Sequence, residues 1–386
     1  MFNWIHSLFE AETKGRLGID IGTSAIKLVE IISDDQKLSL ETYGLASLGK
    51  ESLSGVNSVQ GEKKQTKDDE KGDSKNGKKI DGQDEAIFRA GLPPNSILGA
   101  FSDQEIGQII KELLVRSQAK ARKAYFSLPT FTTFFATIEL PAMGDKEINA
   151  AVPFEAAKYV PIPLEEVFLD WSVIPAPRQT EEKQKPADRE KEKGKEEKEE
   201  QKLETDKKQS ESVNVLVVAI LKEAVAKYTK IAQISNLEVK ALEPESFSLA
   251  RALVGESKDL FIVVDIGSFF TNITLIDQGF IRLVYNLKKN GHPEGGQLDD
   301  DALVGGINSI LNSYKAKGHS AAIPKYILTG GRLQVLDVGR ILRDRLDFEV
   351  VIGNPFENIN YPKGLEPALK EMSPSLGVAA GLAMRE

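Results

Sequence analysis

The fold of this chain is decided by residues 17–31, LGIDIGTSAIKLVEI, where a short apolar run ends in Asp-Ile-Gly and small hydroxylated residues follow. Residues 17–22 and 25–32 are apolar and rich in β-branched side chains, so they predict two strands around a Gly-Thr-Ser turn. A second run, FIVVDIGSFFTNITLI at 261–276, repeats the pattern. The repetition predicts two similar β-hairpins in two parts of the chain.

The first of these hairpins has the features of a phosphate site. Gly22, Thr23 and Ser24 form a turn whose backbone N–H groups can converge on phosphate oxygens. The carboxylate of Asp20 can hold a hydrated Mg²⁺ that neutralises those oxygens. Lys27 lies on the returning strand and can bring its ammonium group to the same oxygens. Since a single Asp-x-Gly also occurs at plain turns, this hairpin alone does not predict a ligand.

The second hairpin supplies the same types of residue. Asp265 is the second candidate for holding Mg²⁺ through water, and Gly267, Ser268 and Thr271 follow it. Two such hairpins, one from each of two lobes, can hold a triphosphate between them. The pair is therefore a much stronger signal than either copy.

A third motif lies at 326–333, YILTGGRL, which predicts a strand, a Gly-Gly turn and the start of a helix. Gly330 and Gly331 allow the backbone to pass close to a flat adenine or a ribose. Taken alone, the same turn is equally consistent with a tight strand-to-helix connection that binds nothing.

The composition excludes several classes of protein. The 386 residues, 41% of them hydrophobic, suffice for two domains. A net charge of −8 without a basic patch argues against nucleic-acid binding. The absence of cysteine excludes disulfides and thiolate metal ligands, and the three histidines show no metal-binding spacing. With no long apolar run and no signal-peptide pattern at the N-terminus, the sequence predicts a cytoplasmic protein.

Three segments differ from the rest of the chain. Residues 51–85 and 178–211 are highly charged with almost no apolar side chains, so we expect mobile insertions. The leader at 1–16 places apolar residues at helical spacing. It predicts either an amphipathic helix that touches a membrane or partner, or a terminus that packs on its own domain or frays.

Strands and helices alternate between these segments. Ser102 and Glu105 form a capping-box pattern, which predicts the start of a helix. Pro153 should kink or shorten the helix expected at 145–159. The other expected strands are 123–128, 133–140, 167–174, 213–220, 237–242, 271–276, 279–285, 325–329 and 348–352, and the other helices 221–235, 245–254, 298–315, 332–345 and 374–384.

In this order, the two hairpins and the Gly-Gly turn resemble the ATPase core shared by actin, hexokinase and DnaK-type chaperones. The resemblance implies a duplicated α/β fold that binds ATP and Mg²⁺ between two lobes. It assigns Asp20, Gly22, Thr23, Ser24 and Lys27 to the first phosphate motif, Asp265, Gly267, Ser268 and Thr271 to the second, and Gly330 with Gly331 to the adenosine loop.

Four further segments resemble the PilM family, the cytoplasmic actin-like component of type IV pilus assembly. They are AAKYVPIPLEEVFLDWSV at 156–173, LEPESFSLARAL at 242–253, VVIGNPFENI at 350–359 and SPSLGVAAGLAMR at 373–385. The resemblance implies an ATP-binding scaffold whose groove beside an inserted subdomain receives the cytoplasmic N-terminal peptide of PilN, a single-span inner-membrane protein. Nucleotide is then expected to tune that groove by stabilising the closed arrangement of the lobes. The protein is expected at the inner face of the inner membrane, held there by its partner and beside other pilus assembly components.

By this resemblance the fold is two-lobed and actin-like, with duplicated ribonuclease H-like lobes and an inserted strand-helix-strand-strand subdomain. The expected division is a leader at 1–16, a first lobe at 17–123 and 221–256, an inserted peptide-binding subdomain at 124–220, a second lobe at 257–373 and a C-terminal helix at 374–386 that packs on the first lobe.

Two features depart from the superfamily pattern. Phe269 and Phe270 are bulky where the second phosphate turn is expected to be small, so Phe269 either blocks the approach of phosphate or points into the core. Glu245 falls near the place where actin positions its attacking water. It is either a water-orienting carboxylate or a helix-start residue without a catalytic part. Whether ATP is hydrolysed therefore stays open.

Two alternatives remain. An FtsA-like cell-division protein is the nearest relative in fold, but it usually carries a C-terminal amphipathic membrane helix that this sequence does not show. A small-molecule kinase of the same superfamily needs an aspartate base between 86 and 170, and Asp170 is better explained as a surface or pairing residue. The sequence also leaves open self-association, the pilus or secretion system that is served and the role of the two insertions.

Overall fold

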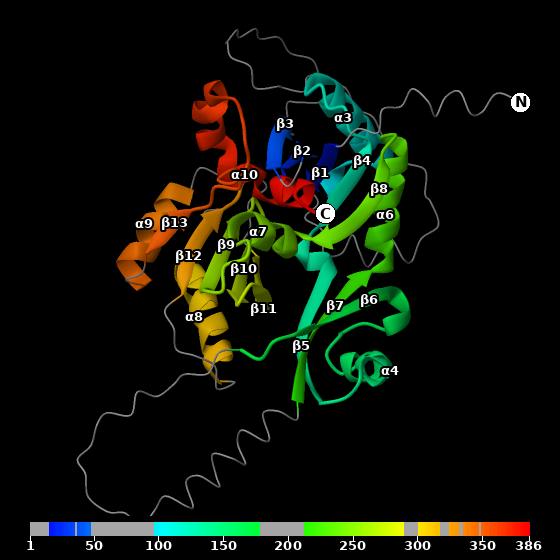
Figure 1. Cartoon of the computed structure of the whole chain (residues 1–386), viewed down its shortest axis with the longest axis vertical. Helices are drawn as coiled ribbons and strands as arrows, with labels where there is room; N and C mark the ends of the chain where they lie inside the picture. The colour runs from blue at the N-terminus through cyan, green and yellow to red at the C-terminus, as the bar shows by residue number, and fades with distance from the viewer. Residues whose placement is uncertain are drawn as a thin grey trace, which may run out of the picture.

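The structure is a computed structural model that describes residues 15–34, 37–47, 96–177, 212–288, 300–316, 324–331, 335–346 and 349–386. Two five-stranded sheets and one three-stranded sheet account for the strands within these ranges (Figure 1). The predicted insertions at 51–85 and 178–211 lie outside the described residues, as does all of the leader except its last two positions.

The first five-stranded sheet has the order β3-β2-β1-β4-β8. The pairs β1–β2 and β2–β3 are antiparallel, whereas β4 and β8 run parallel to β1. The bounds are β1 Gly15–Ile21, β2 Ala25–Asp34, β3 Lys37–Ser47, β4 Lys123–Leu128 and β8 Glu238–Pro244. Two helices, α3 Asp103–Arg116 and α6 Lys222–Ile234, pack together on this sheet and close the core of the first lobe.

The second five-stranded sheet repeats this topology with the order β11-β10-β9-β12-β13. Its first three strands are antiparallel and the last two are parallel to β9. The bounds are β9 Leu260–Ile266, β10 Phe270–Asp277, β11 Phe280–Lys288, β12 Lys325–Thr329 and β13 Val350–Ile352, with helices α8 Asp300–Ala316 and α9 Val335–Leu346. Two sheets with equivalent strand order and direction confirm the predicted duplication of a ribonuclease H-like lobe.

A smaller subdomain is inserted between β4 and α6, and Figure 1 shows it beside the second lobe. Its strands have the order β5-β7-β6, and α4 packs on one face. The bounds are β5 Thr133–Pro141, α4 Asp145–Ala156, β6 Val167–Ile174 and β7 Ser212–Leu221. The chain order of these elements confirms the predicted strand-helix-strand-strand insertion. Pro153 lies inside α4, which ends three residues earlier than predicted.

Two helices, α7 Glu245–Leu253 and α10 Glu366–Ala383, lie between the two large sheets (Figure 1). Gly18 allows β1 and α10 to pack closely, since a Cβ atom on this residue would lie 2.0 Å from the Ala379 carbonyl oxygen. The sequence placed the start of the last helix at 374, which is wrong by eight residues. Pro374 is accommodated inside α10, where its carbonyl oxygen accepts hydrogen bonds from Thr329 and Gly330.

The structure confirms the predicted start of α3 but contains several short or edge elements that the sequence did not predict. The capping box at Ser102 and Glu105 is present at the start of α3. β3 was not predicted, because most of its side chains are half-exposed at the edge of the sheet and the apolar alternation is weak. The short elements α2 Ile97–Ala100, η3 Thr130–Thr132, η4 Leu164–Glu166 and η5 Lys363–Leu365 were also not predicted. None of the helices in the described ranges has the length and apolar character to cross a membrane.

Candidate functional site

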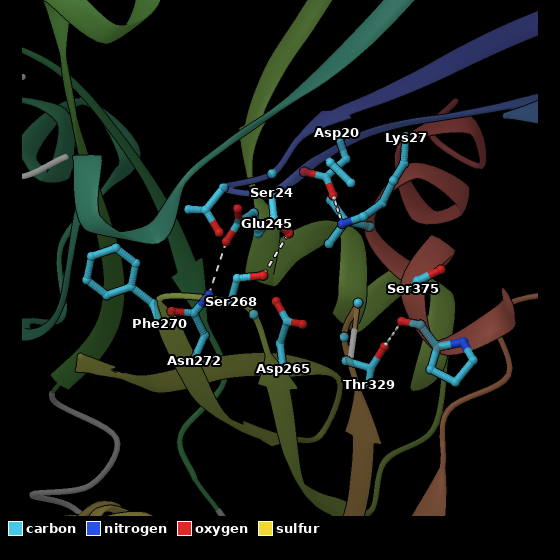
Figure 2. Close-up of a pocket in the computed structure, with 18 of the residues that line it drawn as sticks. Asp20, Ser24, Lys27, Glu245, Asp265, Ser268, Phe270, Asn272, Thr329 and Ser375 are labelled. Carbon is cyan, nitrogen blue, oxygen red and sulfur yellow. Dashed lines mark hydrogen bonds and ion pairs between the residues drawn. The ribbon is translucent and has the colours of Figure 1, made fainter. Parts of the chain in front are cut away.

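The turns of the two hairpins and the Gly-Gly loop after β12 surround one interlobe cavity of about 120 Å³ (Figure 2). Its lining comes from both lobes and from α7 and α10. The predicted site residues that line it are Asp20, Gly22, Thr23, Ser24, Lys27, Glu245, Asp265, Gly267, Ser268, Gly330 and Gly331. The structure thus brings together every predicted site residue except Thr271.

In the first hairpin, β1–β2, a buried ion pair faces the cavity. Asp20 and Lys27 are directly opposite each other in the antiparallel register, so their side chains lie on the same face of the sheet. Lys27 Nζ donates to Asp20 Oδ2 at 2.8 Å, and Ser127 Oγ donates to Asp20 Oδ1 at 2.8 Å. Burial disfavours the charge of Lys27, but the Asp20 carboxylate outweighs this effect and raises the pKa of the ammonium group. The cavity therefore contains a fixed positive charge.

In the second hairpin, β9–β10, the residue opposite the aspartate is Asn272. The register pairs Asp265 with Asn272, as it pairs Asp20 with Lys27 in the first hairpin. Thr271 is one position away, so its side chain points to the other face of the sheet, is fully buried and does not line the cavity. The signal for Asn272 was in the sequence, since it follows its aspartate at the same spacing as Lys27 follows Asp20.

Glu245, the first residue of α7, connects the two lobes within the cavity wall. Its Oε2 accepts hydrogen bonds from Thr130 Oγ1 at 3.2 Å and from Asn272 Nδ2 at 3.1 Å. Burial raises the pKa of the Glu245 carboxyl to about 8, with a further contribution from the negative charges of Asp20 and Asp265. Such a group can change its protonation state near neutral pH, as a proton acceptor for water requires.

The two aromatic residues of the second turn have different positions. Phe270 lines the cavity, and its ring centroid lies 5.1 Å from that of Phe131. Phe269 does not line the cavity. Of the two aromatic residues, Phe270 is therefore the one that could contact a ligand there. The two turns also contact each other directly, since Ser24 Oγ lies 2.7 Å from Ser268 Oγ (Figure 2).

The Gly-Gly loop is held against both the second hairpin and α10. Gly330 has φ +122°, and a Cβ atom there would lie 2.4 Å from the carbonyl oxygen of Ile266. Its N–H donates to the Pro374 carbonyl oxygen at 2.8 Å. Ser375 and Val378 of α10 also line the cavity, although the sequence motifs did not predict them as site residues.

The comparisons with known proteins agree with this arrangement. The sequence model of the family described as type IV pilus assembly protein PilM matches residues 98–188 and 299–386. Over these two segments the chain is similar to the PilM family. The match favours pilus assembly over the division-protein and kinase alternatives.

One solved structure supports the fold of this chain, and two more distant ones are also similar to it. A structure titled as the PilM-PilN type IV pilus biogenesis complex has a TM-score of 0.64 at 21% sequence identity, covering 96% of this chain and 98% of that one. A Bacteroides thetaiotaomicron protein with an actin-like ATPase fold has a TM-score of 0.43 at 9% identity, covering all of both chains. The cytoplasmic domain of EpsL from Vibrio cholerae has a TM-score of 0.41 at 10% identity, covering 93% and 94%. The first of these confirms the two-lobed actin-like fold.

The donor set of the interlobe cavity fits Mg²⁺ bound together with a nucleotide. Among the described residues no group of three or more His, Cys, Asp or Glu side chains could hold a metal ion. Mg²⁺ is usually bound by one or two carboxylates, with water and substrate phosphates completing its shell. Asp20 and Asp265, one from each lobe, can supply such carboxylates, and the bound ion would neutralise phosphate charge.

Proposed function

We propose that this chain is a nucleotide-dependent scaffold of type IV pilus assembly. It binds Mg-ATP between its lobes and binds the cytoplasmic N-terminal segment of a PilN-like inner-membrane protein on its inserted subdomain. The observation that carries the first half is the convergence of both hairpin turns and the Gly-Gly loop on one cavity.

The charges around the cavity support a phosphate ligand. Lys27 provides an ammonium group that is held in place by Asp20 and cannot swing into solvent without leaving that carboxylate buried and unpaired. The turns at Gly22 and Gly267 line the cavity, and backbone N–H groups of turns of this kind are donors that phosphate oxygens accept from. Mg²⁺ between Asp20 and Asp265 would offset the remaining negative charge.

The inserted subdomain offers an edge for an extended peptide. β6 is a terminal strand of the three-stranded sheet, and no strand of the described residues pairs with its outer side, where a further strand could be added. Phe168 on β6 is 52% exposed and lies on the face away from α4, since its neighbour Leu169 packs in the cluster that contains Ile148 and Val152 of α4. Lys222 at the start of α6 places Nζ 5.6 Å from the centroid of the Phe168 ring. These features support an extended, partly apolar peptide beside β6.

Binding to such a peptide would hold the protein at the inner face of the inner membrane. The structure of the PilM-PilN complex supports this choice of partner, because PilN is present there with a protein of the same fold. Coupling between the two sites is expected to pass through the inserted subdomain, whose β5 follows directly after the cavity residues Thr130 and Phe131.

Isothermal titration tests the proposal. Mg-ATP is titrated into the wild-type chain and into Asp20→Ala, each with and without a synthetic PilN-like N-terminal peptide. Asp344→Asn, on the exposed surface of α9, is the matched control. We expect Asp20→Ala to abolish ATP binding, the control to preserve it, and nucleotide to change the affinity for the peptide.

Two results would revise this view. Peptide affinity that is independent of nucleotide would refute the coupling and leave a passive adaptor. A wild-type chain that binds the peptide but no ATP would show that the interlobe cavity keeps the superfamily's fold but does not bind nucleotide.

A further inference from the structure

A second cavity, of about 360 Å³, lies between the inserted subdomain and the second lobe. It shares no lining residue with the interlobe cavity. One wall comes from Thr137, Glu139 and Asn214 of the inserted sheet, and the opposite wall from Arg282 and Leu283 of β11. A volume of this size falls in the range of roughly 300–1,000 Å³ that is usual for small-molecule pockets.

The notable residue in this cavity wall is Arg282, which is 4% exposed. Its Nη1 donates to the Pro175 carbonyl oxygen at 2.6 Å, whereas Nη2 lies 3.7 Å from Asp277 Oδ2, too far for a hydrogen bond. Neither Nε nor Nη2 has a hydrogen-bond acceptor among the described residues. Since an arginine side chain stays charged in proteins, it cannot lower the cost of burial by losing a proton.

The free donors of Arg282 have a specific geometry. Nε–H and one N–H of Nη2 point in parallel along the same edge of the planar guanidinium group, and two parallel donors match the two oxygens of a carboxylate. Both nitrogens are covered in this arrangement, so the guanidinium group must turn toward the cavity to meet a ligand. Burial lowers the pKa of Arg282, and the charge of Asp277 opposes this shift only in part, so a second anionic partner would be favourable.

The surrounding charges favour an anion with one negative charge over an anion with two. Asp277 is 1% exposed and already faces Arg282, and its Oδ2 accepts a hydrogen bond from Tyr314 at 2.9 Å. Glu139 adds an exposed carboxylate at the cavity rim. A dianionic phosphate would meet both of these charges, whereas one carboxylate would interact most strongly with the guanidinium group itself. Leu283 and Tyr159 leave an apolar wall for the rest of the ligand.

We propose that this cavity is a binding site for a small monocarboxylate with an apolar body, held by the side edge of the Arg282 guanidinium group. The ligand would contact the inserted subdomain and the second lobe together, and so would favour one orientation of the two. This proposal is independent of nucleotide and peptide binding.

Calorimetric titration of the full chain tests the site with two matched probes, 4-methylpentanoate and its uncharged analogue 4-methylpentanamide. We expect the carboxylate to bind with a Kd below about 10 mM and the amide to bind at least about tenfold more weakly. Arg282→Lys keeps the positive charge but removes the two parallel N–H donors, so it should abolish the preference for the carboxylate. Arg116→Lys, at an exposed position on α3, is the matched control and should leave binding unchanged.

A third variant keeps the test decisive if Arg282→Lys fails to fold. Glu139→Gln removes a like charge at the rim and should strengthen binding of 4-methylpentanoate about twofold or more, with no effect on the amide. Equal affinity for the two probes, or no binding of either by the folded wild-type chain, would overturn the proposal. Arg282 would then be a structural residue whose free donors are satisfied by water.

Discussion

The two hairpins share a backbone but differ in the chemistry that they present to the cavity. In the first, the residue opposite the aspartate is Lys27, and Asp20 is buried in a network with Lys27 and Ser127. In the second, Asn272 occupies that position and donates to Glu245 instead. A duplicated fold has thus kept the register while its two copies acquired different charges.

This difference assigns separate tasks to the two lobes. The first hairpin carries the fixed ammonium group and so is suited to hold phosphate charge. The second orients Glu245 through the neutral amide of Asn272, at a place where the carboxyl pKa is about 8. The comparison can be tested one hairpin at a time.

The largest effect is expected from Lys27→Met, which leaves the Asp20 carboxylate buried without its cation. Removing one member of a buried ion pair typically costs about 3–5 kcal/mol, so urea unfolding should show a loss of that order. Asp20→Asn combined with Lys27→Met should recover most of the loss, because no charge then remains unpaired. A double variant as unstable as Lys27→Met would show that the pair is not the source of the stability.

A second prediction concerns the pH dependence of stability through Glu245. The carboxyl pKa is about 8 in the folded protein against a usual value of 4.5, so the folded state retains a proton that the unfolded state releases. The stabilisation is complete below about pH 4.5 and is lost progressively as pH rises to about 8, by a few kcal/mol at most. Glu245→Gln does not titrate, so its melting temperature should fall less than that of the wild type between pH 5 and 9. Parallel pH profiles would contradict the raised pKa.

The Gly-Gly loop after β12, which packs against the second hairpin, gives a third test. Gly330→Ala places a methyl group against the backbone of Ile266 at an unfavourable φ, and should destabilise the chain by about 1–3 kcal/mol. Gly331→Ala meets no atom within 4 Å and is the control. Thermal unfolding of the two variants decides whether the close packing of Gly330 is required.

The smallest effect separates two neighbouring residues of β10. Asn272→Ala removes one donor to Glu245 and should weaken Mg-ATP binding by less than about tenfold, consistent with the loss of roughly one hydrogen bond. Thr271→Val should leave binding unchanged, because Thr271 is buried on the opposite face and its hydroxyl has no hydrogen-bond partner within the described part of the chain. If Thr271→Val lost more Mg-ATP affinity than Asn272→Ala, the prediction that Thr271 belongs to the second phosphate motif would be supported instead.

The sequence predicted the parts of the fold that depend on local pattern. Asp-Ile-Gly after an apolar run predicted both hairpins, and the turn residues predicted from them line one cavity. Residues contributed by elements far away in the chain were missed, among them Thr130, Ser375 and Val378, since no local pattern indicates which helix will pack against a turn. Asn272 is a different case, because counting from Asp265 would have identified it.

The helix boundary at α10 shows how tertiary structure can override a local rule. A proline is normally unfavourable in the interior of a helix, and the helix predicted from the sequence began at Pro374. The helix instead begins at Glu366, and the Pro374 carbonyl oxygen accepts hydrogen bonds from Thr329 at the end of β12 and from Gly330 directly after it. That contact joins the C-terminal helix to the adenosine loop, and nothing in the local sequence could indicate it.

Mg-ATP titration of Asp265→Ala in the second lobe, beside Asp20→Ala in the first, tests most directly whether both lobes hold one nucleotide. If one nucleotide is held between the lobes, each substitution alone should reduce the affinity at least about tenfold, although the two residues lie in different hairpins. Wild-type affinity in a folded Asp265→Ala variant would contradict the account, because ATP would then be bound by the first lobe alone.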